Sequence, residues 1–221
     1  MILTTQDLLK KYSTYKNPKC KIARSVSSGE ITQIVRGLYE TNPNISAFWI
    51  ANDIYKPSYL SFETALSFHG LIPEATPVMS SATHGKNKHK LYDTRFGVFF
   101  YRDVPARAYP RGLITIRFDE YKILVASKEK AITDILYVKP TVKTIDELKE
   151  LLFLDLRIDE EKFDLLNKEK LITLCKLYNK NNHRLLIKMI QEEESQKGEG
   201  LSKGFKTSKE LSDDLDKRQN D

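Results

Sequence analysis

A cluster of basic and short polar side chains lies between residues 16 and 36 of this 221-residue chain. Its members are Lys16, Lys19, Lys21, Arg24, Ser25, Ser28 and Arg36. Such groups donate hydrogen bonds to the phosphates and base edges of DNA. From Lys10 to Arg36 there are seven basic residues against Glu30 alone, so this stretch favours a polyanionic partner. The alternative is a small basic helical unit that binds protein.

A second basic stretch runs from His84 to Arg111, with seven basic residues against two acidic ones. Within it, Lys90, Arg95 and Arg102 are the candidates for contact with an acidic partner or with nucleic acid. The alternative is a solvated loop beside a buried strand. From Thr144 to Glu194 the balance reverses, with nine basic and twelve acidic residues.

No catalytic constellation stands out in the sequence. Gly85-Lys86 lacks the other residues of a phosphate-binding loop, and no Gly-x-Ser-x-Gly motif occurs. Asp119, Glu120 and the Glu129-Lys130 pair come nearest to a metal nuclease, but their spacing is unsuitable. We therefore expect no catalytic residue, no metal and no cofactor.

Composition indicates a cytoplasmic protein. The longest stretch without a charge, residues 41–52, is too short for a membrane-spanning helix. Asp7, Lys10 and Lys11 interrupt the region where a signal peptide would be apolar. The two cysteines lie far apart, which suits a reducing compartment.

The elements expected around the first cluster are two short helices and a hairpin. Thr4 caps a helix that reaches Tyr12, and Asn17 with Pro18 begins a second helix that ends before Gly29. This second helix would bury Ile22, Ala23 and Val26. A hairpin over residues 31–41 follows, with Arg36 at its tip, and the order of parts is that of a winged helix-turn-helix.

The rest of the chain predicts a mixture of helices and strands. Helices are expected over residues 47–54 and 61–68, strands from 77 to 125, and helices again from 127 to 194. Residues 195–221 hold few apolar side chains. The expected fold is α+β, with a winged helix-turn-helix domain at 1–72, a C-terminal domain at 73–194 and a flexible tail at 195–221.

Three segments resemble the abortive-infection antitoxin family AbiEi: residues 29–39, residues 59–73 and residues 126–134. The resemblance extends from Thr4 to about Tyr137, and the middle segment is the most specific. Family members are winged-helix transcriptional regulators of toxin–antitoxin pairs. Gln33 departs from the family, because many members carry a basic residue there.

The resemblance implies an autorepressor that binds inverted repeats upstream of its own operon, as monomers binding cooperatively. It also implies that the C-terminal domain opposes a nucleotidyltransferase-type toxin, without an obligatory stable complex. We expect Lys90, Arg95 and Arg102 to contribute to that antitoxin activity. The second hypothesis is a nucleic-acid-processing, nuclease-like enzyme with a basic cleft.

Overall fold

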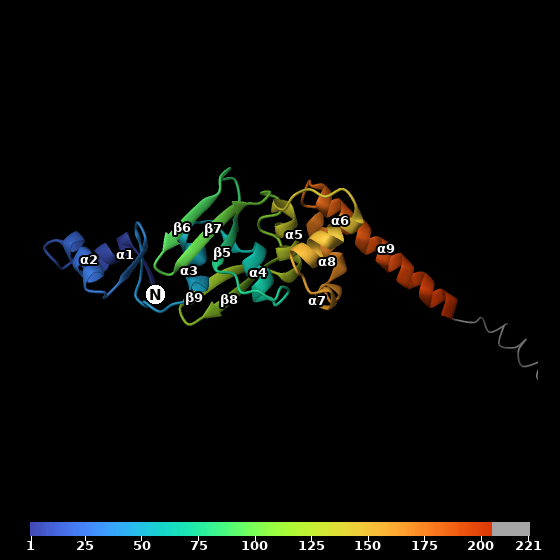
Figure 1. Ribbon diagram of the computed structural model, residues 1–221. Coiled ribbons are helices and arrows are strands. Elements are labelled where there is room, and N and C mark those ends of the chain that lie inside the picture. Colours follow the sequence, from blue (N-terminus) through green and yellow to red (C-terminus); the bar gives the residue numbers. More distant parts are fainter. Residues whose placement is uncertain (205–221) are drawn as a thin grey trace, which may run out of the picture.

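The computed structural model describes the backbone of residues 1–204 and the side chains of residues 1–196. The molecule is elongated: a small N-terminal unit lies at one end, a large sheet in the middle and a group of helices at the other end (Figure 1). Helices and strands are mixed along the chain, which confirms the α+β class. Among the described helices, none combines the length and apolar character needed to cross a lipid bilayer.

The N-terminal unit, residues 1–41, consists of two helices and a three-stranded antiparallel sheet. Its elements are β1 (Ile2–Thr4), α1 (Thr5–Lys11), α2 (Pro18–Ser27), β2 (Thr32–Val35) and β3 (Leu38–Glu40), with the strand order β1-β3-β2. The expected caps are confirmed, because the side chains of Thr4 and Asn17 accept hydrogen bonds from the first turns of α1 and α2. Strand β1 was not expected.

A six-stranded mixed sheet forms the centre of the molecule. Its strands are β4 (Tyr59–Leu60), β5 (Val78–Thr83), β6 (Lys90–Thr94), β7 (Gly97–Asp103), β8 (Leu113–Phe118) and β9 (Tyr121–Ala126). They lie in the order β6-β7-β5-β4-β9-β8, with β5 parallel to β7 and β4 parallel to β9. Within the second basic stretch, the loop that follows β5 ends where β6 begins, at Lys90.

Helices α3 (Ala47–Ile54) and α4 (Phe62–Phe68) cover opposite faces of this sheet. Two successive residues of β7 show the arrangement. Tyr101 donates a hydrogen bond of 2.6 Å to the carbonyl of Ala51 in α3, whereas the Arg102 guanidinium lies 4.0 Å from the Phe62 ring centre in α4. Neighbouring side chains of a strand point to opposite faces, so the two helices must lie on opposite sides.

The remaining helices pack at the far end. They are α5 (Lys128–Val138), α6 (Ile145–Lys149), the π-helix η1 (Glu150–Asp155), α7 (Glu160–Asp164), α8 (Lys168–Cys175) and α9 (Asn181–Gly204). Helix α9 projects away from the body (Figure 1). It continues past Glu194, so residues 195–204 are helical; residues 205–221, the rest of the expected tail, lie outside the described residues.

A domain boundary between residues 72 and 73 would divide the large sheet. Strand β4 pairs with β5 and β9, and α3 and α4 bury their apolar side chains in the same core as these strands. The structure therefore places residues 45–72 with the C-terminal part, and residues 45–196 are called the sheet unit below. Ile34 and Leu38 of the hairpin also join its core, so the two units are packed against each other.

Candidate nucleic-acid interface

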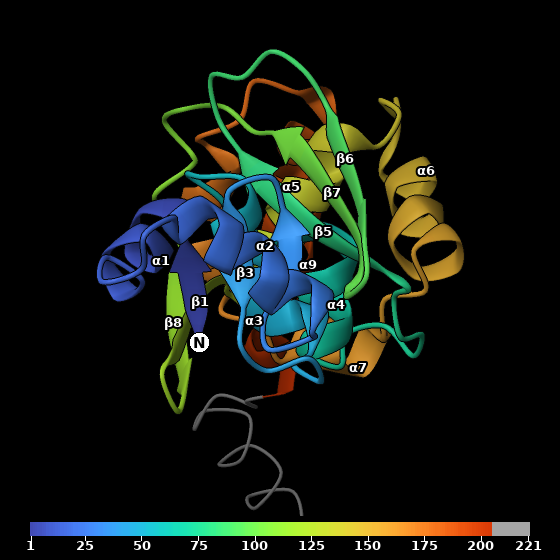
Figure 2. The ribbon, with the colours of Figure 1, turned by 90° about the vertical axis from the view of Figure 1, so that its left-hand side faces the viewer.

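Helix α2 presents a face of short side chains to solvent. Cys20, Ala23 and Ser27 are exposed along it, and the exposed side chains of Lys19 and Arg24 accompany them. These positions recur at three- and four-residue spacing, so they follow one side of the helix. Figure 2 views the molecule from this end, with α1 and α2 in the foreground. A convex face with a small centre and basic neighbours can approach a groove of DNA closely.

Ser25 does not belong to this face, contrary to expectation. It is fully buried, and its hydroxyl donates a hydrogen bond of 2.8 Å to Glu30 and lies 3.2 Å from the Tyr12 hydroxyl. Ala23, expected inside, is exposed. The reason is helical geometry. Ser25 and Val26 follow Ile22 by three and four residues and lie on the same side of α2, whereas Ala23, the next residue, points about 100° away around the helix axis.

Lys21 is also engaged within the N-terminal unit. Its ammonium lies 3.0 Å from Glu30 and 5.3 Å from the centre of the Tyr12 ring. Hydrogen bonds from Lys21, Ser25 and Tyr12 lower the pKa of the Glu30 carboxyl to about 2. Glu30 therefore stays negative and offsets Lys21, which makes Lys21 a weaker candidate for a phosphate contact than Lys19 or Arg24.

Arg36 and Gly37 form the tight turn between β2 and β3. Arg36 is exposed, and Gly37 adopts a φ of +89°, which favours glycine. The backbone N–H of Thr5 donates a 3.0 Å hydrogen bond to the Gly37 carbonyl, so the turn is fixed against the start of α1. Lys16 and Ser28, which flank α2, are exposed as expected. The turn is thus short, and Arg36 is its basic side chain.

The three candidates of the second basic stretch do not form one surface. Arg102 is mostly buried: it pairs with Glu63, and its guanidinium lies against the rings of Phe62 and Phe100. Burial opposes ionisation of Glu63, but Arg102 outweighs it and lowers the pKa of that carboxyl. Arg102 is therefore a structural cation rather than the exposed contact that was expected.

Lys90 and Arg95 lie elsewhere on the β6–β7 hairpin. Lys90 pairs directly with Tyr101, so its side chain shares the α3 face with Tyr101, opposite to Arg102. Arg95 is exposed in the turn that joins the strands, at the other end of β6. The sequence placed the three residues close together, but strand alternation and the hairpin separate them.

The structure instead gathers other groups beside the loop at residues 84–89. The Asp103 carboxylate accepts hydrogen bonds from the backbone N–H groups of Lys86 and Asn87, at 2.6 and 2.7 Å, and fixes this loop. A pocket of about 560 Å³ opens next to it. Its lining consists of Asn87, Lys88, His89, Asp103, Tyr137, Val138, Asn179 and Lys180. Sequence reasoning missed Lys180, because it lies about 90 residues away in the chain.

A buried polar cluster surrounds Asp134. Its carboxylate pairs with the Lys130 ammonium at 2.8 Å and accepts hydrogen bonds from Tyr59, Ser61 and Tyr178 at 2.9, 2.6 and 2.5 Å. Burial lowers the pKa of Lys130, and the neighbouring Asp134 opposes that effect. All of these side chains are almost fully buried, so the cluster joins β4, α5 and the segment between α8 and α9 within the core.

Within residues 1–196, no group of three or more His, Cys, Asp and Glu side chains is arranged to hold a metal ion. In comparisons with known proteins, no family model matches this sequence, and no curated protein matches it either.

Proposed function

We propose that this protein is a DNA-binding transcriptional regulator. In this proposal the N-terminal unit acts as a winged helix-turn-helix, with α2 as the recognition helix and the Arg36–Gly37 turn as the wing. The observation that carries it is the exposed face of α2, where Cys20, Ala23 and Ser27 lie beside Lys19 and Arg24. The order helix, helix, hairpin and the strand order β1-β3-β2 support it.

The proposal extends to an antitoxin that represses its own operon and opposes a nucleotidyltransferase-type toxin. This extension depends on the resemblance of residues 29–39, 59–73 and 126–134 to the antitoxin family. A cytoplasmic location follows from the same proposal, because both the operator and the toxin would be there. In the second basic region, the candidates for antitoxin activity are the half-buried Lys90, the exposed Arg95 and the pocket beside Lys88.

The test is a gel-shift titration of the purified protein with the DNA upstream of its gene and with random DNA of equal length. Arg24→Ala should weaken binding by about 1–3 kcal/mol and reduce the preference for the upstream DNA. Lys10→Ala should weaken binding to both DNAs alike, because an exposed lysine at the end of α1 contacts phosphate only. The log–log salt slope should fall by about 0.9 for each phosphate contact removed.

Ala23→Glu provides a sharper variant, because it places a negative charge in the middle of the exposed face. We expect it to abolish specific binding while the fold is kept. The matched control is Thr173→Glu, which adds the same charge at an exposed position of α8. Equal binding of upstream and random DNA by the unaltered protein would refute the proposal, and metal-dependent cleavage of either DNA would favour a nuclease instead.

A further inference from the structure

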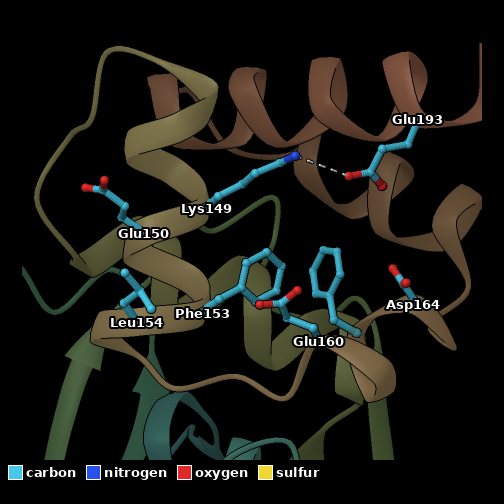
Figure 3. A pocket seen from close by; sticks show the side chains of 8 residues that line it. Lys149, Glu150, Phe153, Leu154, Glu160, Asp164 and Glu193 are labelled. Carbon is cyan, nitrogen blue, oxygen red and sulfur yellow. Dashed lines mark ion pairs between the residues drawn. The ribbon is translucent and has the colours of Figure 1, made fainter. Parts of the chain in front are cut away.

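An acidic groove lies between α6 with η1, α7 and α9 (Figure 3). These helices are at the end of the molecule opposite to α2 (Figure 1). Its volume is about 410 Å³. The side chains that line it are Lys149, Glu150, Phe153, Leu154, Glu160, Phe163, Asp164 and Glu193. None of these residues belongs to the proposed DNA-binding face, so DNA binding does not account for the groove.

The floor of the acidic groove is apolar. The rings of Phe153 and Phe163 meet edge to face, with their centres 5.4 Å apart. Leu154, which lines the same groove, is 71% exposed and adds accessible apolar surface to it. Both Phe153 and Leu154 belong to η1, and π-helical turns are rare and frequent at functional sites.

The rim of the acidic groove is negatively charged. Four carboxylates, those of Glu150, Glu160, Asp164 and Glu193, line the groove together with the Lys149 ammonium. The ammonium of Lys168 also lies 3.8 Å from Asp164, so within the described residues Glu150 and Glu160 carry the unpaired negative charge of the rim. Figure 3 shows Lys149 reaching across to Glu193, where the two charges are 3.9 Å apart. Among residues 1–196, no ion pair engages Glu150 or Glu160.

The Phe163 ring already carries one cation within the protein. The ammonium of Lys168 lies 4.0 Å from the ring centre and donates a hydrogen bond of 2.7 Å to the Phe163 carbonyl. Aromatic faces attract ammonium and guanidinium groups, and nearby carboxylates strengthen the attraction. Phe153, Leu154 and the rim together thus offer apolar contact and negative charge to one incoming segment.

We propose that the acidic groove binds a basic, amphipathic segment of a partner protein. An apolar side chain of that segment would lie against Leu154 and Phe153, while its lysines or arginines would reach Glu150 and Glu160. Charge complementarity identifies the partner class, because the same rim repels the phosphates of a nucleic acid. DNA bound at α2 would leave this groove free, so the protein could hold both partners at once.

The test uses the full-length protein and a labelled helical peptide of about 14 leucine and lysine residues, with the leucines three and four residues apart on one face, followed by fluorescence anisotropy. Reversing two rim charges, in the double variant Glu150→Lys and Glu160→Lys, should weaken binding about tenfold or more. Leu154→Ala should weaken it about threefold to tenfold, because an exposed anchor is lost. A peptide with glycine in place of leucine should bind more weakly than the original.

Two matched variants serve as controls. Glu161→Lys with Glu169→Lys reverses the same number of exposed charges on α7 and α8 outside the acidic groove. Leu165→Ala removes a leucine that is 85% exposed and does not line the groove. Both controls should bind the peptide as tightly as the unaltered protein does.

Three results would overturn the proposal. The first is no binding by the unaltered protein up to about 1 mM peptide. The second is equal weakening by the control variants, which would indicate attraction by net charge alone. The third is self-association of the unaltered protein in sedimentation experiments that the rim variant abolishes, which would make a second copy of this chain the occupant.

Discussion

Cations have different roles in the two units of this molecule. In the N-terminal unit, Lys19 and Arg24 are exposed on α2. The small core of this unit consists of Leu8, Tyr12, Ile22 and Ile31. In the sheet unit, Lys130 is buried, Arg102 is mostly buried, and both are paired with carboxylates. A local count of charge treats all four alike. Burial and pairing decide which of them can meet a partner, and that difference is the basis of the experiments below.

The largest effect on stability should come from cutting the chain between residues 72 and 73, within the sheet unit. A fragment of residues 73–196 lacks α3, α4 and the central strand β4, which joins β5 to β9. We expect it to show no cooperative unfolding by circular dichroism in urea. A fragment of residues 43–196 keeps the whole sheet and should unfold cooperatively, although it loses Ile34 and Leu38 from its core.

A cooperative transition of the shorter fragment would show that residues 45–72 are dispensable for the sheet unit. Otherwise, any test of toxin rescue by an isolated C-terminal part should use the fragment that begins near residue 43. A rescue failure of residues 73–196 would reflect misfolding and say nothing about the antitoxin role.

Short strands explain why the sequence did not reveal this boundary. The caps at Thr4 and Asn17 were predictable, because a polar side chain that accepts from its own helix is a local feature. Strand β4 has two residues and β1 has three, too few to show an alternating pattern. Their positions are set by partners 20 to 65 residues away, such as Ala82 for Tyr59 and Val125 for Leu60.

The candidate interface was predictable only in part, because burial of a side chain also depends on partners that are distant in the sequence. Lys19, Arg24 and Arg36 are exposed, as their types suggest. Ser25 is buried because Tyr12 and Glu30 offer it hydrogen bonds, and Arg102 is buried because Glu63 and Phe62 flank it. A polar side chain can lie inside when partners satisfy it, and those partners come from other elements.

The second prediction concerns the buried pair of the sheet unit. Asp134→Ala leaves the Lys130 ammonium buried without its carboxylate and removes the acceptor of three hydroxyl groups. The free energy of unfolding in urea should fall by about 3–5 kcal/mol. The control Asp93→Ala, at an exposed position of β6, should change it by less than about 0.5 kcal/mol.

The double variant Lys130→Met with Asp134→Asn tests the cause. It removes both charges but keeps an oxygen that can accept from Tyr59 and Ser61, so it should be more stable than Asp134→Ala alone. A double variant that is equally unstable would show that packing around Asp134, rather than the unpaired charge, accounts for the loss.

The third prediction is that the buried histidine of the sheet unit, His183, makes the stability of the protein depend on pH. Burial lowers the pKa of His183 from 6.5 to about 4, against a hydrogen bond to the Thr133 carbonyl that raises it. Between these pH values the unfolded chain binds a proton that the folded state does not, so stability falls as the pH falls. The loss should reach roughly 3 kcal/mol by pH 4.

Urea titrations at several pH values measure this effect. His183→Gln should flatten the dependence between pH 6.5 and pH 4, whereas His89→Gln, at an exposed position, should leave it unchanged. Equal slopes for His183→Gln and the unaltered protein would assign the pH dependence to other groups.

The smallest expected changes in stability are those of substitutions in the second basic stretch. They distinguish side chains that stabilise the fold from side chains that are free to bind a partner. Arg102→Ala removes the ion pair with Glu63 and the contact with the Phe62 ring, and should destabilise the protein by about 2 kcal/mol. Lys90→Ala and Arg95→Ala should each change stability by less than about 0.5 kcal/mol, because Arg95 is exposed and Lys90 has only a distant ring contact of 5.8 Å.

Co-expression with the proposed toxin then tests whether these side chains contribute to rescue of the cells, separately from their contribution to stability. If the basic stretch acts on a partner, the stable double variant Lys90→Ala with Arg95→Ala should rescue cells less well than the unaltered protein at equal soluble amounts. Arg102→Ala should reduce rescue only in proportion to the folded protein that remains, and Arg102→Lys should recover part of the stability without the planar contact. Full rescue by the double variant would remove both side chains from the antitoxin surface, leaving the pocket beside Lys88 and Lys180 as the next surface to alter.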